Sequence, residues 1–374
     1  MSPASALQLD SALTKVLDAF PFPAPPVHIA PYGNGHINRT YCVVCKDANQ
    51  APVRYILQGL SQTAFAHPEQ VMENFIGITS FLKKKIEKEN GDPTRQTLSV
   101  IPTRDGKKYY TDIQGQLWRL MPFIENTECY QSATPALFEA SARAFGNFQY
   151  LLADYPAETL YETIPNFHNT EDRLAKFLHS LQKDPMGRAA EVQKEIQFVM
   201  DRQADCSVLV DAQREGKLPL RVTHNDTKLN NILMDADTHE GICIVDLDTT
   251  MPGLSAYDFG DAIRFGANNG AEDEKNPNSI CFDLRLFAAY TRGFLEGTKG
   301  TLTPAELEYL PWGARIITLE CGIRFLTDYL DGDVYFHAKY PGQNLDRART
   351  QFKLVQDMEA QFSQMCAVIA QYTA

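Results

Sequence analysis

One polar stretch near the middle of the chain constrains its fold more than any other feature. Residues 224–231 read His-Asn-Asp-Thr-Lys-Leu-Asn-Asn, and fifteen residues later the apolar run 241–245 leads into Asp246-Leu-Asp248. Short apolar runs bounded by polar residues are typical of buried strands. We therefore expect strands at 220–223, 231–235 and 241–246, which present acidic and amide side chains where they end.

The spacing of these polar residues is that of a phosphoryl-transfer loop. Asp226 precedes Asn231 by five residues, and His224 stands two residues before the Asp, as in the catalytic loop of protein kinases. In such loops a carboxylate orients the acceptor hydroxyl, while an amide and a further carboxylate hold Mg²⁺ on the nucleotide phosphates. We expect Asp226 to be the catalytic carboxylate and Asn231 and Asp246 to be Mg²⁺ ligands. Asp248 is a further candidate ligand if the strand continues, and otherwise a turn residue.

Other readings of the same region stay open. The whole stretch could be an Asx-rich loop without chemistry, because short motifs also match by chance. Lys228 either neutralises the γ-phosphate or is a solvated loop lysine. We expect His224 to support the loop through hydrogen bonds. The run Asp258-Phe-Gly-Asp261 starts a predicted helix, and we expect the carboxylate of Asp258 to cap its free amides.

A glycine-containing turn lies near the N-terminus, between strands predicted at 27–31 and 39–46. It reads Tyr-Gly-Asn-Gly-His-Ile-Asn over residues 32–38. Glycines let backbone amides approach phosphates closely. Gly33, Gly35 and Asn38 are therefore candidate nucleotide-binding residues, and a plain hairpin turn is the alternative.

The next strand, at 53–59, departs from the protein-kinase pattern. Kinases place a lysine there, which contacts the α- and β-phosphates and pairs with a glutamate on the following helix. Here the strand carries Gln58, and Glu73 is the candidate on the helix predicted at 68–89. A fixed positive charge is thus missing, so either another basic group substitutes for it or the site has decayed. Gln58 remains a candidate phosphate contact.

Strands predicted at 98–103, 107–112 and 116–121 complete the sheet, after a polar loop at 90–97. The run 121–126 then leads into helical sequence, where an interlobe hinge would lie. Met121 and Phe123 are candidates to pack on an adenine ring, although an ordinary linker would read the same way.

The predicted fold class is therefore α+β, with two lobes. Residues 1–124 form a small β-rich lobe that contains a leading helix at 6–20, the sheet and one long helix. Residues 125–374 form a larger, mainly helical lobe. Its helices are expected at 135–153, 170–182, 188–215, 281–297, 303–331 and 345–371.

Composition narrows the partners and the compartment. A net charge of −12 argues against nucleic acid and anionic membranes, which select basic patches. No apolar run approaches the length of a membrane span, and the first residues lack a secretory pattern. The eight cysteines have no framework spacing, and the pair Cys42 and Cys45 would point to opposite faces of a strand. We expect a cytoplasmic protein.

These motifs resemble the aminoglycoside phosphotransferase and choline kinase-like superfamily, and within it the N-acetylhexosamine 1-kinases. The resemblance runs from about residue 30 to about residue 355. It rests on Gly35-His-Ile-Asn-Arg-Thr-Tyr41, the 224–231 stretch, Asp246-Leu-Asp-Thr-Thr-Met-Pro-Gly253, Asp258-Phe-Gly-Asp-Ala-Ile-Arg264, Arg324-Phe-Leu-Thr-Asp-Tyr-Leu330 and Asn344-Leu-Asp-Arg-Ala-Arg349.

The resemblance implies a protein-kinase-like bilobal fold, ATP and Mg²⁺ as cofactors, and a small sugar as acceptor. By analogy, Arg324 and Tyr335 would hold sugar hydroxyls and Phe265 would pack on the pyranose ring. His36 and Asp226 would face the anomeric oxygen, which receives the phosphate. The 1-kinases also carry Leu-Gln at the strand end where this chain has Gln58.

Alternatives to this assignment remain open at this level. Arg324 lies among apolar residues and could instead form a salt bridge with Asp328, Asp331 or Asp333. The acceptor could be an aminoglycoside, choline or another small alcohol, and the absent lysine leaves a non-catalytic nucleotide-binding protein as a third reading.

Overall fold

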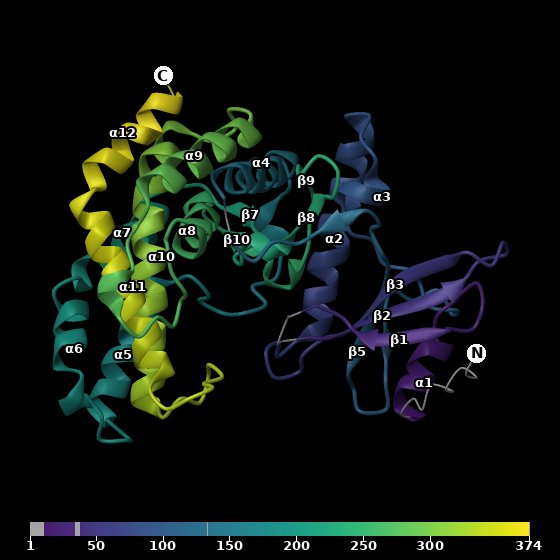
Figure 1. Cartoon of the computed structure of the whole chain (residues 1–374), viewed down its shortest axis with the longest axis horizontal. Helices are drawn as coiled ribbons and strands as arrows, with labels where there is room; N and C mark the ends of the chain where they lie inside the picture. The colour runs from purple at the N-terminus through teal and green to yellow at the C-terminus, as the bar shows by residue number, and fades with distance from the viewer. Residues whose placement is uncertain (1–10, 34–37, 133, 374) are drawn as a thin grey trace. The chain divides into compact units, whose positions relative to one another are not determined.

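The chain forms two compact units, Met1–Thr127 (unit 1) and Glu128–Ala374 (unit 2), in the computed structural model of Figure 1. The structure describes residues 11–33, 38–132 and 134–373. Unit 1 contains the larger sheet and unit 2 is mainly helical. The expected α+β class is therefore confirmed.

Unit 1 is built on an antiparallel sheet with the strand order β1-β2-β3-β5-β4. Its strands are β1 (His28–Pro31), β2 (Arg39–Lys46), β3 (Pro52–Gly59), β4 (Tyr110–Thr111) and β5 (Leu117–Pro122). The first three lie where the sequence predicts them. The strand expected at 98–103 does not form, and only Ile101 pairs with Leu120 there. Pro102 has no amide hydrogen to donate, and a turn from Thr103 to Lys107 follows directly.

Helices cover both faces of this sheet because side chains alternate along each strand. On one face, Leu57, Trp118 and Leu120 form a core with Val16 of α1 (Ser11–Asp18) and its neighbours. The opposite face of β5 contacts α2 (Pro68–Lys88), on which Phe75 packs against Arg119. The polar loop expected at 90–97 contains one short helix, α3 (Pro93–Gln96), whose N-terminus is capped by Asp92.

Unit 2 contains most of the helices. They are α4 (Pro135–Leu151), α5 (Thr170–Lys183), α6 (Gln193–Met200), α7 (Val208–Arg214), α8 (Ser255–Gly266), α9 (Leu284–Thr298), α10 (Pro304–Asp331), α11 (Gln343–Ala360) and α12 (Phe362–Thr373). Its strands are short. They are β6 (Thr127–Glu128), where the chain enters unit 2, β7 (Arg221–Thr223), β8 (Ile232–Asp235), β9 (Gly241–Ile244) and β10 (Met251–Gly253).

Two long helices predicted from the sequence are each broken in the structure. The segment 188–215 divides into α6 and α7, which pack in different clusters: Ile196 and Val199 join one core, and Leu209 and Ala212 join another. The segment 345–371 divides into α11 and α12 at Gln361. Helical periodicity alone does not show such breaks, because each half keeps an apolar face.

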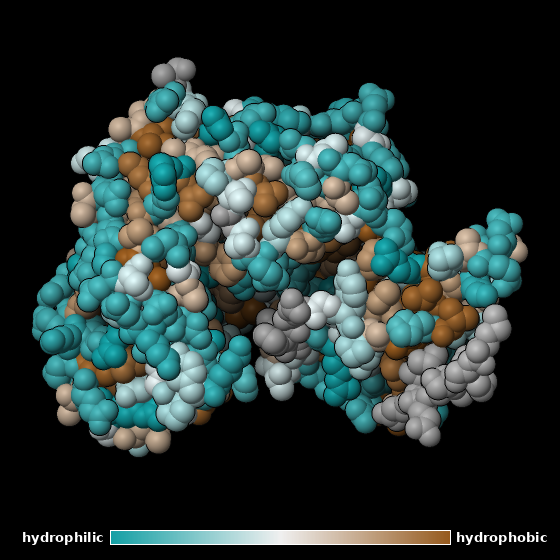
Figure 2. Space-filling model, viewed as in Figure 1, coloured by the Kyte–Doolittle hydropathy of each residue, from teal (hydrophilic) through white to brown (hydrophobic). Residues whose placement is uncertain are grey.

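The surface in Figure 2 is mostly hydrophilic on the face shown, with hydrophobic residues in small separate groups. Among the described residues, no helix is both long and apolar enough to cross a membrane.

Helices α8 and α10 touch through glycines. A Cβ atom at Gly260 would collide with the carbonyl oxygen of Gly313, and one at Gly313 would collide with the backbone of Ala256. Only a residue without a side chain allows backbones to approach this closely. This contact fixes the position of α8, which supports the polar loop described below.

We predict that Gly260→Ala destabilises the protein by about 1–3 kcal/mol, because the two helices must separate. Alanine is the better helix former by about 1 kcal/mol, so a mutation without the collision would raise the melting temperature. Thermal unfolding of the purified variant distinguishes these results. An unchanged or higher Tm would contradict the close packing of α8 on α10.

Candidate active site

The loop that follows β7 is held from below by one buried carboxylate. Asp258 Oδ2 accepts hydrogen bonds from the amide of His224 at 3.0 Å and from Gln149 Nε2 at 3.0 Å, and its Oδ1 accepts from the amide of Asn225 at 2.8 Å. Burial raises the pKa of Asp258, whereas the three donated hydrogen bonds act in the opposite direction. Asp258 therefore fixes the backbone of the residues that precede Asp226.

This role differs from the helix cap that we expected. Helix α8 already begins at Ser255, after Leu254, so Asp258 lies within its first turns. Its side chain points to the loop instead of to the helix amides. The local sequence pattern is that of a cap, and only the packing of α8 beneath the loop shows the actual partner.

His224 supports the loop, as expected, and is fully buried. Its Nε2 lies 2.9 Å from the carbonyl of Val245, and its Nδ1 accepts from the amide of Asp226 at 3.2 Å. These contacts define a neutral imidazole with the proton on Nε2. The ring thereby joins the catalytic loop to the segment that follows β9.

Asp226 is held by two side chains of its own loop. Lys228 Nζ lies 2.6 Å from its Oδ1, and Asn231 Nδ2 donates to its Oδ2 at 2.9 Å and to its backbone oxygen at 2.8 Å. Burial opposes the charge of Lys228, but Asp226 and Asp261 outweigh this effect and raise the pKa of the amine. The carboxylate of Asp226 is thus oriented, and Asn231 keeps its amide oxygen available for another ligand.

Asp246 and Asp248 are not presented from a continuing strand. Strand β9 ends at Ile244, Asp246 has a left-handed backbone with φ of 59°, and residues 247–249 form a 3₁₀ turn. Asp246 is exposed and Asp248 is buried, so the two carboxylates do not point the same way. The strand does not continue to Asp248, so the alternative holds and Asp248 is a turn residue. Asp246 remains the candidate ligand, and the turn explains how it reaches outward.

A divalent cation here would rely on few protein ligands. Within the described ranges, no three His, Cys, Asp or Glu side chains gather into a ready-made metal site. The amide oxygen of Asn231 and the carboxylate of Asp246 are hard donors, which suit Mg²⁺, a cation that usually takes one or two protein ligands and completes its shell with phosphates and water. The donor set fits Mg²⁺ bound together with a nucleotide.

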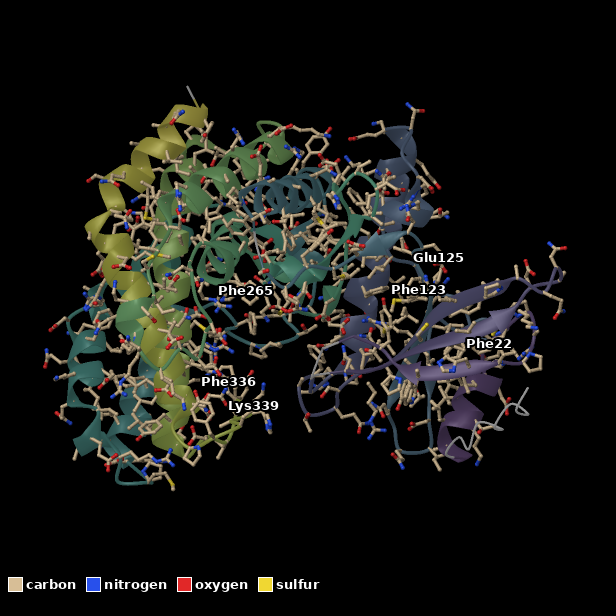
Figure 3. The ribbon with its side chains drawn as sticks, viewed as in Figure 1. Phe22, Phe123, Glu125, Phe265, Phe336 and Lys339 are labelled. Carbon is tan, nitrogen blue, oxygen red and sulfur yellow. The ribbon has the colours of Figure 1, made fainter. Side chains whose placement is uncertain are left out.

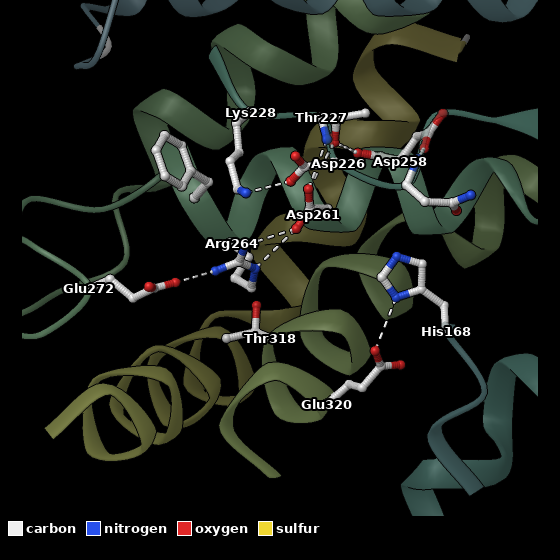
Figure 4. Close-up of polar contacts among 12 residues, drawn as sticks. His168, Asp226, Thr227, Lys228, Asp258, Asp261, Arg264, Glu272, Thr318 and Glu320 are labelled. Carbon is white, nitrogen blue, oxygen red and sulfur yellow. Dashed lines mark hydrogen bonds and ion pairs between the residues drawn. The ribbon is translucent and has the colours of Figure 1, made fainter. Parts of the chain in front are cut away.

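A row of alternating charges continues from the loop into α8 and beyond (Figure 4). Asp261 Oδ2 accepts from the amide of Thr227 at 2.8 Å, and its Oδ1 pairs with Arg264 at 2.9 Å. Arg264 in turn pairs with Glu272 at 2.9 Å. Burial opposes the ionisation of Asp261, but Arg264 and Lys228 outweigh it and lower the pKa of this carboxyl. Each charge of the row is compensated by its neighbour.

Arg324 lies in a second polar cluster of unit 2, among aromatic rings. Its guanidinium carbon is 5.5 Å from the ring centre of Phe167, 5.9 Å from that of Tyr335 and 5.4 Å from that of Phe336. Arg173 is close enough to Arg324 for the two charges to interact: burial lowers the pKa of Arg173, and the like charge of Arg324 acts in the same direction.

The salt bridge considered for Arg324 is absent among the described residues. Asp328 accepts from the amides of residues 334–336, Asp331 accepts from Ser180, and Asp333 pairs with Arg188. All three carboxylates are thus engaged elsewhere.

Glu320 provides the negative charge of this second cluster. It is buried, and its two oxygens contact His168 Nδ1 and the hydroxyl of Thr170, each at 3.0 Å. Burial opposes its ionisation, but His168, Arg324 and Arg173 outweigh this and lower the pKa of Glu320. One carboxylate therefore faces two arginines.

The loop after α10 carries the remaining acceptor candidates. Residues 333–341 line a surface hollow of about 550 Å³. Tyr335 is 69% exposed, and its amide is held by Asp328 at 2.7 Å. Phe265 lies on α8 and Phe336 on this loop (Figure 3), and Phe265 is partly buried. His36 lies outside the described residues. The structure thus brings Arg324 and Tyr335 together. Among the described residues, no ring contact or cation–π contact joins Phe265 to them.

The nucleotide-binding candidates of unit 1 lie along β1, β2, β3 and β5. Gly33 has φ of 82°, a conformation that favours glycine. Asn38 Oδ1 accepts from the amide of Ser61 at 2.9 Å and so ties the turn to the end of β3. Gly35 lies outside the described residues. Met121 is buried in β5.

Phe123 follows β5 and is already covered on one side. Its ring lies 3.8 Å from the guanidinium carbon of Arg54 and 5.5 Å from the ring of Tyr32 (Figure 3 labels Phe123).

Gln58 has a partner that we did not expect. Arg119 donates to its Oε1 from Nε at 3.0 Å and from Nη2 at 2.5 Å. Glu73, the expected partner on α2, is exposed, whereas Met72 and Phe75 of the same helix contact Arg119. The glutamate assigned from the kinase pattern therefore points away from the strand residue.

Sequence reasoning missed Arg119, Glu320, Arg173 and Asp261. The signal for the first two was present: each is a charge inside an otherwise apolar run, Leu117–Met121 or Ile316–Ile323. Asp261 follows Asp258 by three residues and so shares its face of α8. Nothing in the local sequence distinguishes Arg173 from a surface arginine.

Comparisons with known proteins agree with this architecture. The family model described as APH, Phosphotransferase enzyme family, matches residues 28–295. An aminoglycoside phosphotransferase from Alicyclobacillus acidocaldarius is 11% identical, with a TM-score of 0.62 and 98% of each chain covered. A microcompartment-associated aminopropanol kinase is 15% identical, with a TM-score of 0.57 and 95% and 98% covered. An amicoumacin kinase, solved with AMP-PNP and Ca²⁺, is 12% identical, with a TM-score of 0.55 and 92% and 93% covered. At these identities the likeness shows the fold, and the expected kinase-like architecture is confirmed.

We predict that Asp258→Asn destabilises the protein by about 3 kcal/mol or more and loosens the loop at 224–227. An amide has one acceptor oxygen instead of two, so buried backbone donors lose their partner, at a cost of about 1–3 kcal/mol each. Thermal unfolding and hydrogen exchange of the loop amides measure the two effects. Asp201→Asn, at an exposed carboxylate that accepts from Gln197, is the matched control. Equal stability of both variants would remove Asp258 as the support of the loop.

Proposed function

The chain belongs to the phosphotransferase enzyme family, and we propose that it is an ATP- and Mg²⁺-dependent kinase that phosphorylates the anomeric hydroxyl of an N-acetylhexosamine. The acceptor would be N-acetylglucosamine or N-acetylgalactosamine, and the product the sugar 1-phosphate. A nucleotide and a divalent cation are supported by the family and by the donor set of the loop. The charges and aromatic rings around Arg324 are the observation on which the assignment of the acceptor rests.

Asp226 is the proposed base. A sugar hydroxyl has a pKa far above that of a carboxylate, so Asp226 orients it and accepts its proton late, as charge moves to the transferred phosphoryl group. Lys228 and Asn231 hold the carboxylate in one orientation through contacts of 2.6 and 2.9 Å. Bound Mg²⁺ would neutralise phosphate charge, with Asn231 and Asp246 as its protein ligands.

The charges of the Arg324 cluster favour a neutral acceptor. Arg173 and Arg324 act on each other as like charges, and Glu320 compensates both. Asp172, the other carboxylate that acts on Arg173, is paired with Lys176 at 2.6 Å. A second cation placed here would be repelled. An uncharged sugar offers hydroxyl and acetamido oxygens, which can accept from both guanidinium groups.

Shape considerations lead to the same class. The planar fork of an arginine suits two neighbouring oxygens, and aromatic rings pack against the C–H face of a pyranose. Phe167, Tyr335 and Phe336 surround Arg324, and Phe265 on α8 is the proposed wall for the ring.

An amine-bearing alcohol is the second candidate class of acceptor. The aminoglycoside phosphotransferase and the aminopropanol kinase share the fold, and their names indicate amine substrates. The two arginines argue against that class for this chain, because an ammonium group requires carboxylates or an aromatic cage without competing cations.

We predict that Asp226→Asn lowers kcat at least about 10²-fold, since the hydroxyl loses its proton acceptor. The fold and the affinity for Mg·ATP should change little. Steady-state kinetics and calorimetric nucleotide binding measure both quantities. Turnover close to that of the wild type would exclude Asp226 from the proton transfer.

We predict ADP release with free N-acetylhexosamines and none with their methyl glycosides, because a methyl group blocks the anomeric oxygen. The assay uses a panel of neutral sugars, aminoglycosides and choline, and ³¹P and ¹H NMR locate the phosphate. A methyl glycoside turned over as fast as the free sugar would move the reaction to another hydroxyl. Turnover restricted to the amines would refute the neutral acceptor.

In the same assay, Arg324→Ala should lower kcat/KM for the sugar about 10²-fold or more, because a site built for hydroxyls discriminates strongly once its donors are lost. KM for ATP should stay nearly constant. Arg285→Ala is the matched control, since this arginine of α9 has a side chain that is 89% exposed. Equal effects of the two substitutions would contradict the assignment of Arg324.

A further inference from the structure

Arg119 is a buried cation in the middle of an apolar strand. It is 1% exposed and is among the largest fully buried side chains of the described residues. Its neighbours on β5, Trp118 and Leu120, belong to the core on the other face of the sheet. Burying a charge is costly unless the protein uses it or compensates it, so this position requires an explanation.

The guanidinium is fixed against the residue that replaces the kinase lysine. Arg119 stands directly opposite Gln58 in the pairing of β3 with β5. Two of its N–H groups converge on Gln58 Oε1, at 3.0 and 2.5 Å, and its carbon lies 4.3 Å from the ring centre of Phe75 on α2. The sulfur of Met72, also on α2, lies 3.8 Å from Nη1 of Arg119.

This contact determines which way the amide of Gln58 faces. An arginine can only donate, so the oxygen of Gln58 must point to it and the nitrogen must point away. Nε2 donates one hydrogen to Thr40 Oγ1 at 3.2 Å on β2. The partly exposed end of Gln58 therefore presents donors, as a lysine at this position would.

The distribution of charge around residue 58 also differs from that of the lysine–glutamate pair in kinases. A strand lysine and a helix glutamate sum to zero, and the lysine is the member that contacts the phosphates. Here the strand residue is neutral, the arginine stands behind it, and Glu73 of α2 is exposed on another side of the helix. The cation has moved from β3 to β5.

We propose that Arg119 is the positive charge that stabilises the nucleotide phosphates in place of the missing lysine, and that it acts through Gln58, which it orients. The inference rests on the proposed use of ATP but not on the identity of the acceptor. Arg119 is thus a positioning residue: Gln58 donates to a phosphate oxygen, while the guanidinium polarises the amide and adds its own field across a medium of low dielectric constant.

Moving the charge back to β3 tests this. Four variants are compared with the wild type by calorimetry with Mg·ATP and with adenosine: Arg119→Met, Arg119→Lys, Gln58→Lys, and Arg119→Met together with Gln58→Lys. Adenosine lacks the phosphates and reports on the integrity of the site. Arg104→Leu, at an exposed arginine of unit 1 that donates to the carbonyl of Asp18, controls for the change in net charge.

We expect Arg119→Met to weaken Mg·ATP binding about 10-fold or more and adenosine binding less than 2-fold. Gln58→Lys alone should also weaken Mg·ATP binding, because its ammonium is repelled by the buried guanidinium. The double variant should recover most of the affinity, since it has the cation on β3 and no opposing charge. Arg119→Lys keeps the charge but not the fork, and its loss should be smaller than that of Arg119→Met.

Several results would overturn the inference. These are an equal loss of ATP and adenosine affinity in Arg119→Met, a gain of ATP affinity in Gln58→Lys alone, or a double variant no better than either single one. If Arg119→Met does not fold, a double variant that folds but does not bind Mg·ATP has the same meaning. A different result would refute the proposed acceptor alone: the variants bind Mg·ATP as expected, but the wild-type protein phosphorylates no N-acetylhexosamine.

Discussion

The chemistry proposed for unit 2 depends on the hydrogen bonds that Asp258 accepts from the backbone of His224 and Asn225. They hold the loop that carries Asp226, and the glycine contact between α8 and α10 holds the helix that carries Asp258. A carboxylate that is proposed to receive a proton at one atom needs a rigid backbone beneath it. Here the rigidity comes from a second carboxylate, buried and saturated with donors, one helix away.

Unit 2 contains two groups of interacting charged side chains. The row from Lys228 through Asp261 and Arg264 to Glu272 alternates in sign, and each member is compensated. The cluster around Arg324 is different, because Arg173 and Arg324 share Glu320 and the nearby Asp172 is paired with Lys176. Compensated charges build structure, whereas an excess of donors beside aromatic rings is what an uncharged, oxygen-rich ligand would complete. This contrast distinguishes the proposed acceptor region from its surroundings.

In unit 1, the strand position at which kinases carry a lysine is occupied by a different pair of side chains, Gln58 and Arg119. The kinase pattern uses a lysine supported by a glutamate, and this chain has a partly exposed amide supported by a buried arginine. Both arrangements present hydrogen-bond donors at the same strand position. If Arg119 acts through Gln58 as proposed, the absence of Lys at residue 58 is a poor sign of a decayed site, because the neighbouring strand carries the charge.

The sequence by itself determined the α+β class, strands β1 to β3 and helix α2, because these depend on local periodicity. Spacing within one segment also singled out the polar loop at 224–231, whose catalytic role is proposed. The sequence did not determine the breaks at 201–207 and Gln361, the turn that carries Asp246, or the partners of Asp258 and Gln58. Those depend on contacts between residues far apart in the chain: Asp258 and His224 meet across 34 positions, and Arg119 and Gln58 across 61. A buried charge is recognisable in the sequence as an exception to an apolar run, but its partner is chosen only when the tertiary structure brings a complementary group to it, since the partner must remove the cost of burial.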